Sequence, residues 1–231
     1  MEKRIPLIIA AILLTLPCLN AQEISQEKFI QLYLWAELDA YPESYSAEKE
    51  THPEDTEFSY PIRRIKELAP FLLEGMIYGW DFVYTPSDKQ RGVAEYFERT
   101  EIKPLGNDAK NIIYKHPFAE DGKLNVWIEF SRTQAMISYL KYWTASTHPK
   151  IRGTGSAPVQ DGFDGISKAC GEAIKDAVRT YFRTQIRNKP KEISGKVLLR
   201  RQPRISTDSG QYVVDLDFFI ETVRIIPYIQ F

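Results

Sequence analysis

The chain has 231 residues, with 30 Lys and Arg against 31 Asp and Glu, so its formal net charge is -1. This balance excludes a chain-wide basic surface, and we expect no nucleic-acid partner. With 43% hydrophobic and 26% charged residues, the composition is typical of a packed globular protein and excludes a disordered chain.

The N-terminal segment has the order of a secretory signal peptide. Two basic residues precede an apolar stretch from residue 5 to 19, and the small residue Ala21 precedes Gln22. A membrane-spanning helix needs about 20 apolar residues, so this stretch is too short for an anchor. We therefore predict a signal peptide over 1–21, cleaved between Ala21 and Gln22. The mature chain is expected in the periplasm or outside the cell, without an integral membrane span.

The two cysteines differ in position and in meaning. Cys18 follows Pro17, where a lipid-attachment signal has a small residue, which argues against lipid anchoring. Cleavage after residue 21 leaves Cys170 as the one cysteine of the mature chain. An intramolecular disulfide is then excluded, and with it the disulfide-stapled class of secreted domain.

In chain order, the first predicted element is a helix over 26–38, where apolar residues such as Phe29, Leu32 and Trp35 recur at roughly helical spacing. The segment at about 41–61 is rich in Pro, Ser and Glu and is interpreted as an acidic loop. We expect the loop to face water, with cation or partner binding as the alternative.

Residues 62–69 indicate a short helix that ends near Pro70. Residues 76–84 alternate with period two and predict a strand whose even-numbered face is buried. Ser87 and Gln90 match a capping box, which predicts a helix to about Arg99.

Residues 124–130 alternate again and predict a second strand. Residues 133–145 have a polar line at helical spacing but also an aromatic content that suits a strand, and we favour a helix. The segment 149–158 is interpreted as irregular, or as a strand leaving into a loop.

The longest predicted helix covers about 165–187, because apolar residues keep the i, i+3, i+4, i+7 rhythm throughout. Asp164 is the expected N-cap, and Asn188 and Pro190 end the helix. Cys170 lies on the apolar stripe, so we interpret it as a buried core residue rather than a nucleophile.

Two further strands are predicted over 193–202 and 211–223, joined by a turn through 206–210. Opposing Val197 with Phe218, Leu199 with Leu216, and Arg200 with Asp215 keeps apolar residues on one face. The predicted fold class is α+β, a single domain over 22–231. Its C-terminal hairpin packs against the long helix, and the earlier strands complete a mixed or antiparallel sheet.

No metal or cofactor is expected. His52, His116 and His148 each precede a proline, which favours extended backbone in loops, and they are too far apart in the sequence for a zinc site. The segment 152–156 has the Gly and hydroxyl content of an anion-binding loop. It lacks the spacing of a phosphate or dinucleotide motif, so a turn is favoured.

The catalytic candidates are two carboxylates. Asp81 on the predicted strand and the nearby Asp88 could form the pair that glycoside hydrolysis needs, with Trp80, Trp127 and Trp143 lining a sugar cleft. We favour the alternative, in which the aromatic residues fill a core and Asp81 faces solvent or a cross-strand partner.

Residues 150–187 combine Gly153-Thr154-Gly155 with Ala169, Ala173 and Ala177 at intervals of four. This pattern resembles small modules of bacterial envelope lipoproteins and flagellar-assembly proteins, in which a G-x-G strand precedes an alanine-spaced helix packed on a sheet. The resemblance implies an envelope-associated binding or structural part, and it brings no catalytic residues with it.

The leading functional hypothesis is therefore an exported periplasmic or envelope-associated binding or structural module without catalytic chemistry. Its partner would be an envelope protein or another envelope component. The abundance of aromatic residues favours interfaces as well as cores. The alternatives are a secreted glycan-active hydrolase that uses Asp81, and a carrier of a small ligand.

Overall fold

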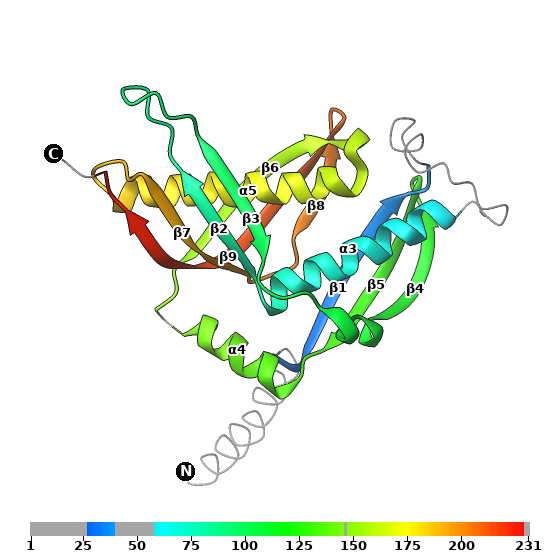
Figure 1. Ribbon diagram of the computed structural model, residues 1–231. Coiled ribbons are helices and arrows are strands. Elements are labelled where there is room, and N and C mark those ends of the chain that lie inside the picture. Colours follow the sequence, from blue (N-terminus) through cyan, green and yellow to red (C-terminus); the bar gives the residue numbers. More distant parts are fainter. Residues whose placement is uncertain (1–26, 40–57, 146, 229–231) are drawn as a thin grey trace, which may run out of the picture.

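The computed structural model describes residues 27–39, 58–145 and 147–228. Figure 1 shows two lobes, each made of a sheet and one long helix. The sheets have three and six strands, and every pairing between their strands is antiparallel. The predicted α+β class, with C-terminal strands packed against a long helix, is confirmed.

The small sheet has the strand order β1 (Phe29–Glu37), β5 (Lys123–Ser131) and β4 (Ile113–Glu120). β5 confirms the strand predicted over 124–130, because its even-numbered residues are buried on the inner face. The long helix α3 (Ser59–Ile77) covers that face. The small lobe is thus one helix packed on one face of a three-stranded sheet (Figure 1).

The helix predicted over 26–38 is wrong, because most of this segment forms β1. Ile30, Leu32 and Leu34 are buried with period two, while the aromatic residues Tyr33 and Trp35 lie on the outer face. Apolar residues on both faces of a strand imitate helical spacing. Pairing with β5 over the full length of β1 selects the extended form.

α3 is longer than the helix predicted over 62–69 and contains Pro70 in its interior. Proline removes one hydrogen bond from a helix, but residues on both sides of Pro70 are buried, and this packing keeps the helix continuous. The first residues of α3 occupy the end of the segment predicted as an acidic loop over 41–61. The rest of that loop, and the predicted signal peptide with Cys18, Ala21 and Gln22, lie outside the described residues.

The large sheet has the order β3 (Tyr96–Glu101), β2 (Trp80–Thr85), β7 (Glu192–Leu199), β9 (Gln211–Ile226) and β6 (Lys150–Pro158), and β8 (Arg204–Asp208) also pairs with β9. The strand predicted over 76–84 is partly right, since its even-numbered residues from Trp80 onward are buried. Residues 76 and 77 instead end α3, and Gly79 turns the chain with φ +78°.

The helix predicted from Ser87 to Arg99 is wrong. The carboxylate of Asp88 accepts hydrogen bonds from the backbone N–H groups of Gln90 (3.0 Å) and Arg91 (3.3 Å), which closes a turn. β3 follows the turn and pairs with β2. The turn at Asp88 and the pairing of β3 with β2 therefore determine the structure of this segment, and the capping pattern of Ser87 and Gln90 does not produce a helix.

The helix favoured over 133–145 is confirmed as α4 (Gln134–Thr144), which follows the short 3₁₀ helix η1 (Gly106–Asn111) and β4 and β5. The Thr133 hydroxyl accepts from the Met136 backbone N–H and caps the first turn of α4. Trp143 of α4 is fully buried against Leu198 and Phe219 of the large sheet. These residues lie on the face of that sheet opposite the long helix α5 (Gly162–Gln185).

Of the two alternatives for 149–158, the strand is the one observed, because the segment forms the regular strand β6. The turn favoured over 152–156 is wrong, since these residues lie inside that strand. β6 packs against the helix α5 (Gly162–Gln185), with η2 (Val159–Asp161) between them. A Cβ atom placed on Gly155 would lie 2.2 Å from the Ala169 carbonyl oxygen, and one on Gly153 would lie 2.0 Å from that of Ala173. The two glycines thus let the helix backbone lie directly on the strand.

α5 confirms the helix predicted over 165–187, with shifted ends. It begins at Gly162, so Asp164 lies in its first turn rather than at the N-cap, which is Asp161. Figure 1 shows α5 crossing one face of the large sheet. Its apolar stripe, including Cys170, is buried against that sheet.

The C-terminal strands differ from the prediction in register and in number. Val197 pairs with Ile220 and Leu199 with Phe218, two residues from the predicted positions. The predicted strand 193–202 ends early, and β8 makes the hairpin with β9 and places Arg204 beside Asp215. A two-residue shift leaves every side chain on its expected face, so hydrophobic patterning does not detect it.

The two lobes share one buried apolar cluster, and polar contacts also join them. The side-chain amide of Gln202 accepts from the Tyr33 backbone N–H (3.0 Å) and donates to the Tyr33 carbonyl oxygen (2.5 Å). The Tyr212 hydroxyl donates to Glu37 across the same junction (3.2 Å). In the part of the chain that the structure describes, no helix combines the length and apolar character needed to cross a membrane.

Candidate functional site

A basic cleft lies at the end of the large lobe. Two adjoining hollows, about 1090 Å³ and 590 Å³, share lining residues that include Arg187 and Lys189. They are formed by the β2–β3 connection, the last turns of α5, the α5–β7 connection and the end of β9. Figure 1 shows these segments gathered beside the C-terminal end of the chain. We call both hollows together the basic cleft.

Positive charge dominates the lining of the basic cleft. Two carboxylates, Asp88 and Glu95, are outnumbered by six cations, namely Lys89, Arg91, Arg179, Arg183, Arg187 and Lys189. Lys89, Arg183 and Arg187 are exposed and make no ion pair with the described residues. The Lys189 ammonium donates to the Ser87 carbonyl oxygen at 2.7 Å, which ties the two walls together.

Both carboxylates already have arginine partners. The Asp88 carboxylate accepts from the Arg91 guanidinium at 2.6 Å, and this bond lowers its pKa. Arg179 donates to both oxygens of Glu95, at 2.9 and 2.6 Å, and lowers the pKa of that carboxyl. The Tyr84 hydroxyl also donates to Glu95 at 2.8 Å. The paired groups cancel locally, so the remaining field of the cleft is positive.

One wall of the basic cleft is apolar and aromatic. The Arg91 guanidinium lies 4.5 Å from the ring centroid of Tyr228, a cation–π distance. The Tyr228 hydroxyl is buried and has no hydrogen-bond partner among the described residues. Ile225 and Pro227 continue this wall along the end of β9. The cleft therefore offers cations and an apolar surface side by side.

The cations gather here for a local reason. α5 ends at Gln185, and the exposed carbonyl groups of a helix C-terminus favour nearby positive charge. Arg179, Arg183 and Arg187 recur every four residues, which is the one sequence signal that could have indicated the cleft. The other walls come from segments far apart in the sequence, so no sequence motif indicates them.

The structure does not bring Asp81 and Asp88 together as a pair. Asp81 lies near the start of β2, where its cross-strand neighbours are Thr100 and Lys196. Asp88 follows the end of β2 and is engaged by Arg91. The strand advances about 3.3 Å per residue, so the two carboxylates lie at opposite ends of it.

The three tryptophans considered for a sugar cleft do not line one surface. Trp80 and Trp143 are fully buried, and each belongs to a different core cluster. Trp127 is 45% exposed on the outer face of the small sheet, with its ring centroid 5.1 Å from that of Tyr33. The core interpretation therefore describes two of the three residues.

Cys170 is completely buried, and burial raises the pKa of its thiol to about 12. A thiol in this environment stays protonated and behaves as a small apolar side chain, as the helix pattern predicted.

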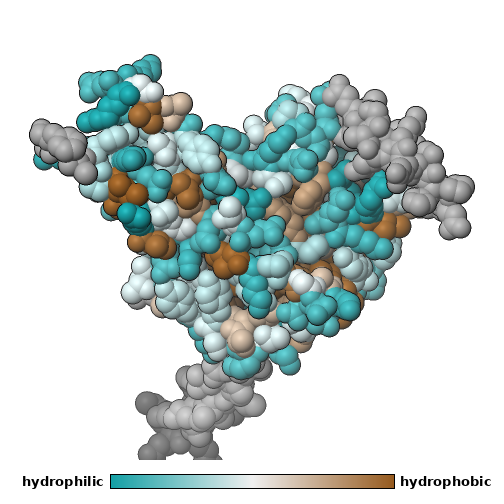
Figure 2. Space-filling model, viewed as in Figure 1, coloured by the Kyte–Doolittle hydropathy of each residue, from teal (hydrophilic) through white to brown (hydrophobic). Residues whose placement is uncertain are grey.

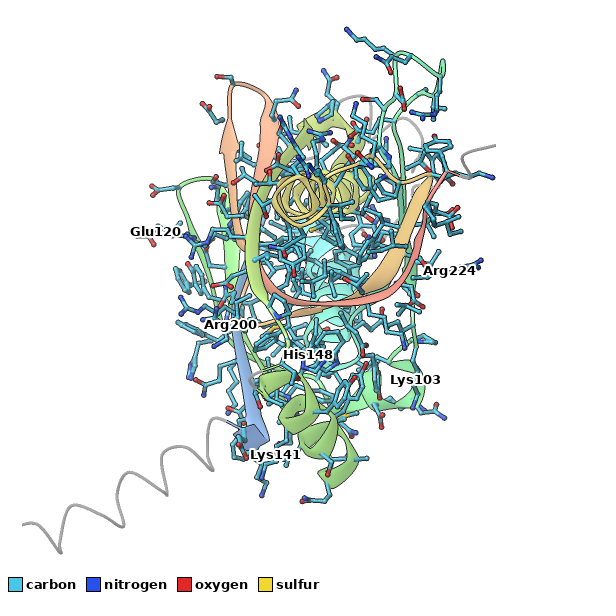
Figure 3. The ribbon with its side chains drawn as sticks, turned by 90° about the vertical axis from the view of Figure 1, so that its left-hand side faces the viewer. Lys103, Glu120, Lys141, His148, Arg200 and Arg224 are labelled. Atoms are coloured by element: carbon cyan, nitrogen blue, oxygen red, sulfur yellow. The ribbon has the colours of Figure 1, made fainter. Side chains whose placement is uncertain are left out.

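The expectation for the histidines is partly wrong. His116 has φ +50° and lies in β4, where the register with β5 shifts, so it is neither extended nor in a loop. His148 does lie in a loop, with its ring 4.9 Å from that of Trp143 near the end of α4 (Figure 3). His52 lies outside the described residues. Within the described ranges, no group of three or more His, Cys, Asp or Glu side chains could hold a metal ion.

A further hollow, of about 500 Å³, lies between α3 and β4 in the small lobe, apart from the basic cleft. Lys66 is its one charged lining residue. The other lining residues are apolar or aromatic: Phe58, Ile62, Ile65, Tyr114, Pro117, Phe118, Ala119, Leu124 and Val126. We call it the apolar groove. It differs from the basic cleft in charge, and it lies in the other lobe.

Comparison with known proteins shows a family and a similar protein. A protein of Treponema pallidum (strain Nichols), described as an uncharacterized protein, is 29% identical over 199 residues. The alignment covers 86% of this chain and 82% of the relative. No solved structure matches the chain. A protein-family model matches residues 17–228, most of the chain, and the chain therefore belongs to that family.

Proposed function

We propose that the protein is an exported, envelope-associated binding module whose basic cleft holds an anionic component of the envelope. The observation that carries this proposal is the excess of cations in the cleft, four of which have no carboxylate partner among the described residues. The predicted signal peptide supports export, and the resemblance of residues 150–187 to envelope modules supports the location.

The protonation states in the cleft favour binding over catalysis. Acid–base chemistry near neutral pH uses groups whose pKa values are poised close to that pH. Asp88 and Glu95 instead have lowered pKa values and act as anchors for Arg91 and Arg179. Unpaired guanidinium and ammonium groups are suited to phosphate or carboxylate oxygens, which they bind by charge-assisted hydrogen bonds.

The test is binding to inorganic polyphosphate. Fluorescence anisotropy of a labelled polyphosphate measures it over a range of salt concentrations. Replacing Arg183 and Arg187 by Gln should lower the affinity at least about tenfold. The slope of log affinity against log salt should fall by roughly two, because two fewer cations displace counterions. Neutral Gln preserves helix propensity at the end of α5.

The matched control replaces Lys66 and Lys110 by Gln. Both lysines are exposed and lie outside the cleft, and this double variant loses the same net charge. It should bind polyphosphate as the parent does. Equal losses in the two double variants would show that only net charge matters and would refute a specific role for the basic cleft.

The apolar groove favours a second candidate function, carriage of a small ligand. Its volume of about 500 Å³ lies within the usual range for ligand sites, and Lys66 could pair with one anionic group on an otherwise apolar molecule. Native mass spectrometry with and without added palmitate would detect such a ligand. A Lys66→Gln variant that binds palmitate as well as the parent would contradict the predicted pairing.

A further inference from the structure

Exposed apolar side chains lie next to the basic cleft. Val223 is 62% exposed and Ile225 is 43% exposed, both near the end of β9. Figure 2 shows brown apolar surface interspersed with teal polar surface on the lobe that carries this end. Burial of such aliphatic surface against an apolar partner releases hydration water and is favourable.

Cations border these apolar residues. Arg224 lies between them in the sequence and is exposed, and Figure 3 shows it projecting away from the sheet at the end of β9. Lys189 and Lys191, also exposed, precede the neighbouring strand β7, whose first residue Glu192 pairs with Ile226. One end of the large lobe therefore combines protruding aliphatic groups with a surrounding set of positive charges.

We propose that this end of the large lobe docks on the surface of an anionic lipid bilayer. Val223 and Ile225 enter the boundary between headgroups and acyl chains, and the surrounding cations contact lipid phosphates. The inference rests on the proposed function and names the anionic component as membrane lipid. A soluble polyanion in the cleft would use the cations and leave Val223, which lies outside the cleft lining, exposed, whereas a bilayer surface matches both.

Tyr228 is consistent with the same orientation. It lines the basic cleft beyond the end of β9, with Arg91 over its ring. The Tyr228 hydroxyl is buried, so the ring does not itself reach the headgroups, but it positions the Arg91 guanidinium at the edge of the cleft. The basic cleft would then face the headgroup layer.

The first experiment compares sedimentation with vesicles of phosphatidylcholine alone and with vesicles that also contain phosphatidylglycerol. We expect at least about tenfold stronger partitioning onto the anionic vesicles, and a steep loss of binding as salt is raised. Val223→Thr keeps the β-branched shape and adds a hydroxyl, and should lower partitioning about fivefold. It should leave polyphosphate affinity unchanged, since Val223 does not line the cleft.

The second experiment reports insertion directly. Cys170 is buried, so an environment-sensitive fluorophore can be attached selectively to Val223→Cys in the mature chain. Its emission should shift to the blue on anionic vesicles, while the same label on Lys110→Cys, exposed on η1 and outside both the basic cleft and the apolar groove, should not respond.

The outcomes separate the two proposals. Binding to polyphosphate without binding to anionic vesicles overturns the bilayer inference and leaves the proposed function standing. Failure to bind either probe removes both. Equal binding to neutral and anionic vesicles, or equal spectral shifts at positions 223 and 110, also overturns the inference.

Discussion

Replacing Gly155 by Ala tests the close contact between β6 and α5. The added Cβ would lie 2.2 Å from the Ala169 carbonyl oxygen and 2.3 Å from the Ala173 nitrogen, both backbone atoms of the helix. Ordinary contact begins at 3.4 Å, so the helix and the strand would have to separate by about 1.2 Å. Side-chain rotation cannot relieve a clash with backbone.

The expected cost is large because α5 buries its apolar stripe on the same sheet. Ile174 and Val178 are fully buried, and separation of the helix would open space around them. Overpacking of cores costs about 1–3 kcal/mol, and a clash with backbone lies at or above the upper end. We expect Gly155→Ala to lower the free energy of unfolding by about 3 kcal/mol or more.

Gly171→Ala is the matched control within α5. A Cβ at this position would meet only a carbon atom of Phe97, at 3.9 Å, which is ordinary contact. Alanine is the better helix former by about 0.8–1 kcal/mol, so this variant should be slightly more stable than the parent. The same Gly→Ala change is thus expected to lower the free energy of unfolding at position 155 and to raise it at position 171, although both positions belong to the α5–β6 unit.

Urea denaturation of the mature chain, followed by tryptophan fluorescence, measures both variants. Trp80 on β2 is fully buried and stacks on Phe71 of α3, so its emission should report unfolding of the core that the two lobes share. If Gly155→Ala lowers the free energy of unfolding by less than about 1 kcal/mol at an unchanged m-value, the argument from the Cβ contacts is refuted. Destabilisation of equal size by Gly171→Ala would also refute it.

Three further predictions concern single side chains. Burial, together with the bond to Glu95, raises the pKa of Tyr84 to about 12 from an ordinary 10, so its contribution to stability is complete below pH 10 and is lost as pH rises toward 12. Unfolding measured against pH should show a loss of up to about 2 kcal/mol, absent in Tyr84→Phe. Cys170 should react with a thiol reagent only at the rate of unfolding, and fast labelling in native buffer would contradict its burial. Gln202→Ala removes both hydrogen bonds to the Tyr33 backbone and should cost about 1–3 kcal/mol, with faster amide hydrogen exchange at Tyr33. An exchange rate equal to that of the parent would show that Gln202 does not protect the Tyr33 N–H group.

The elements that could be predicted from the sequence are those with apolar residues on one face only. α5 and β5 each bury one face, so the period of their patterns identifies them. β1 has apolar residues on both faces, and only its pairing with β5 separates it from a helix. The turn at Asp88 likewise depends on β3 pairing with β2, since the capping signal at Ser87 is purely local.

The candidate site was less accessible to prediction than the fold. The spacing of Arg179, Arg183 and Arg187 is visible in the sequence, but the other walls of the basic cleft come from the β2–β3 connection and the end of β9. Which cations of the cleft stay unpaired depends on which arginines form ion pairs with Asp88 and Glu95. Contacts of this kind join residues that are far apart in the sequence.

The amino-acid sequence alone determined the α+β class, the long amphipathic helix and the burial of Cys170, because each depends on a local period of apolar residues. The tertiary structure alone decided that residues 29–37 are a strand, that β7 and β9 pair two residues from the simplest register, and that unpaired cations meet beside Val223. Hydrogen-bonding partners and neutralising charges come from distant segments, so their effects are absent from any local pattern.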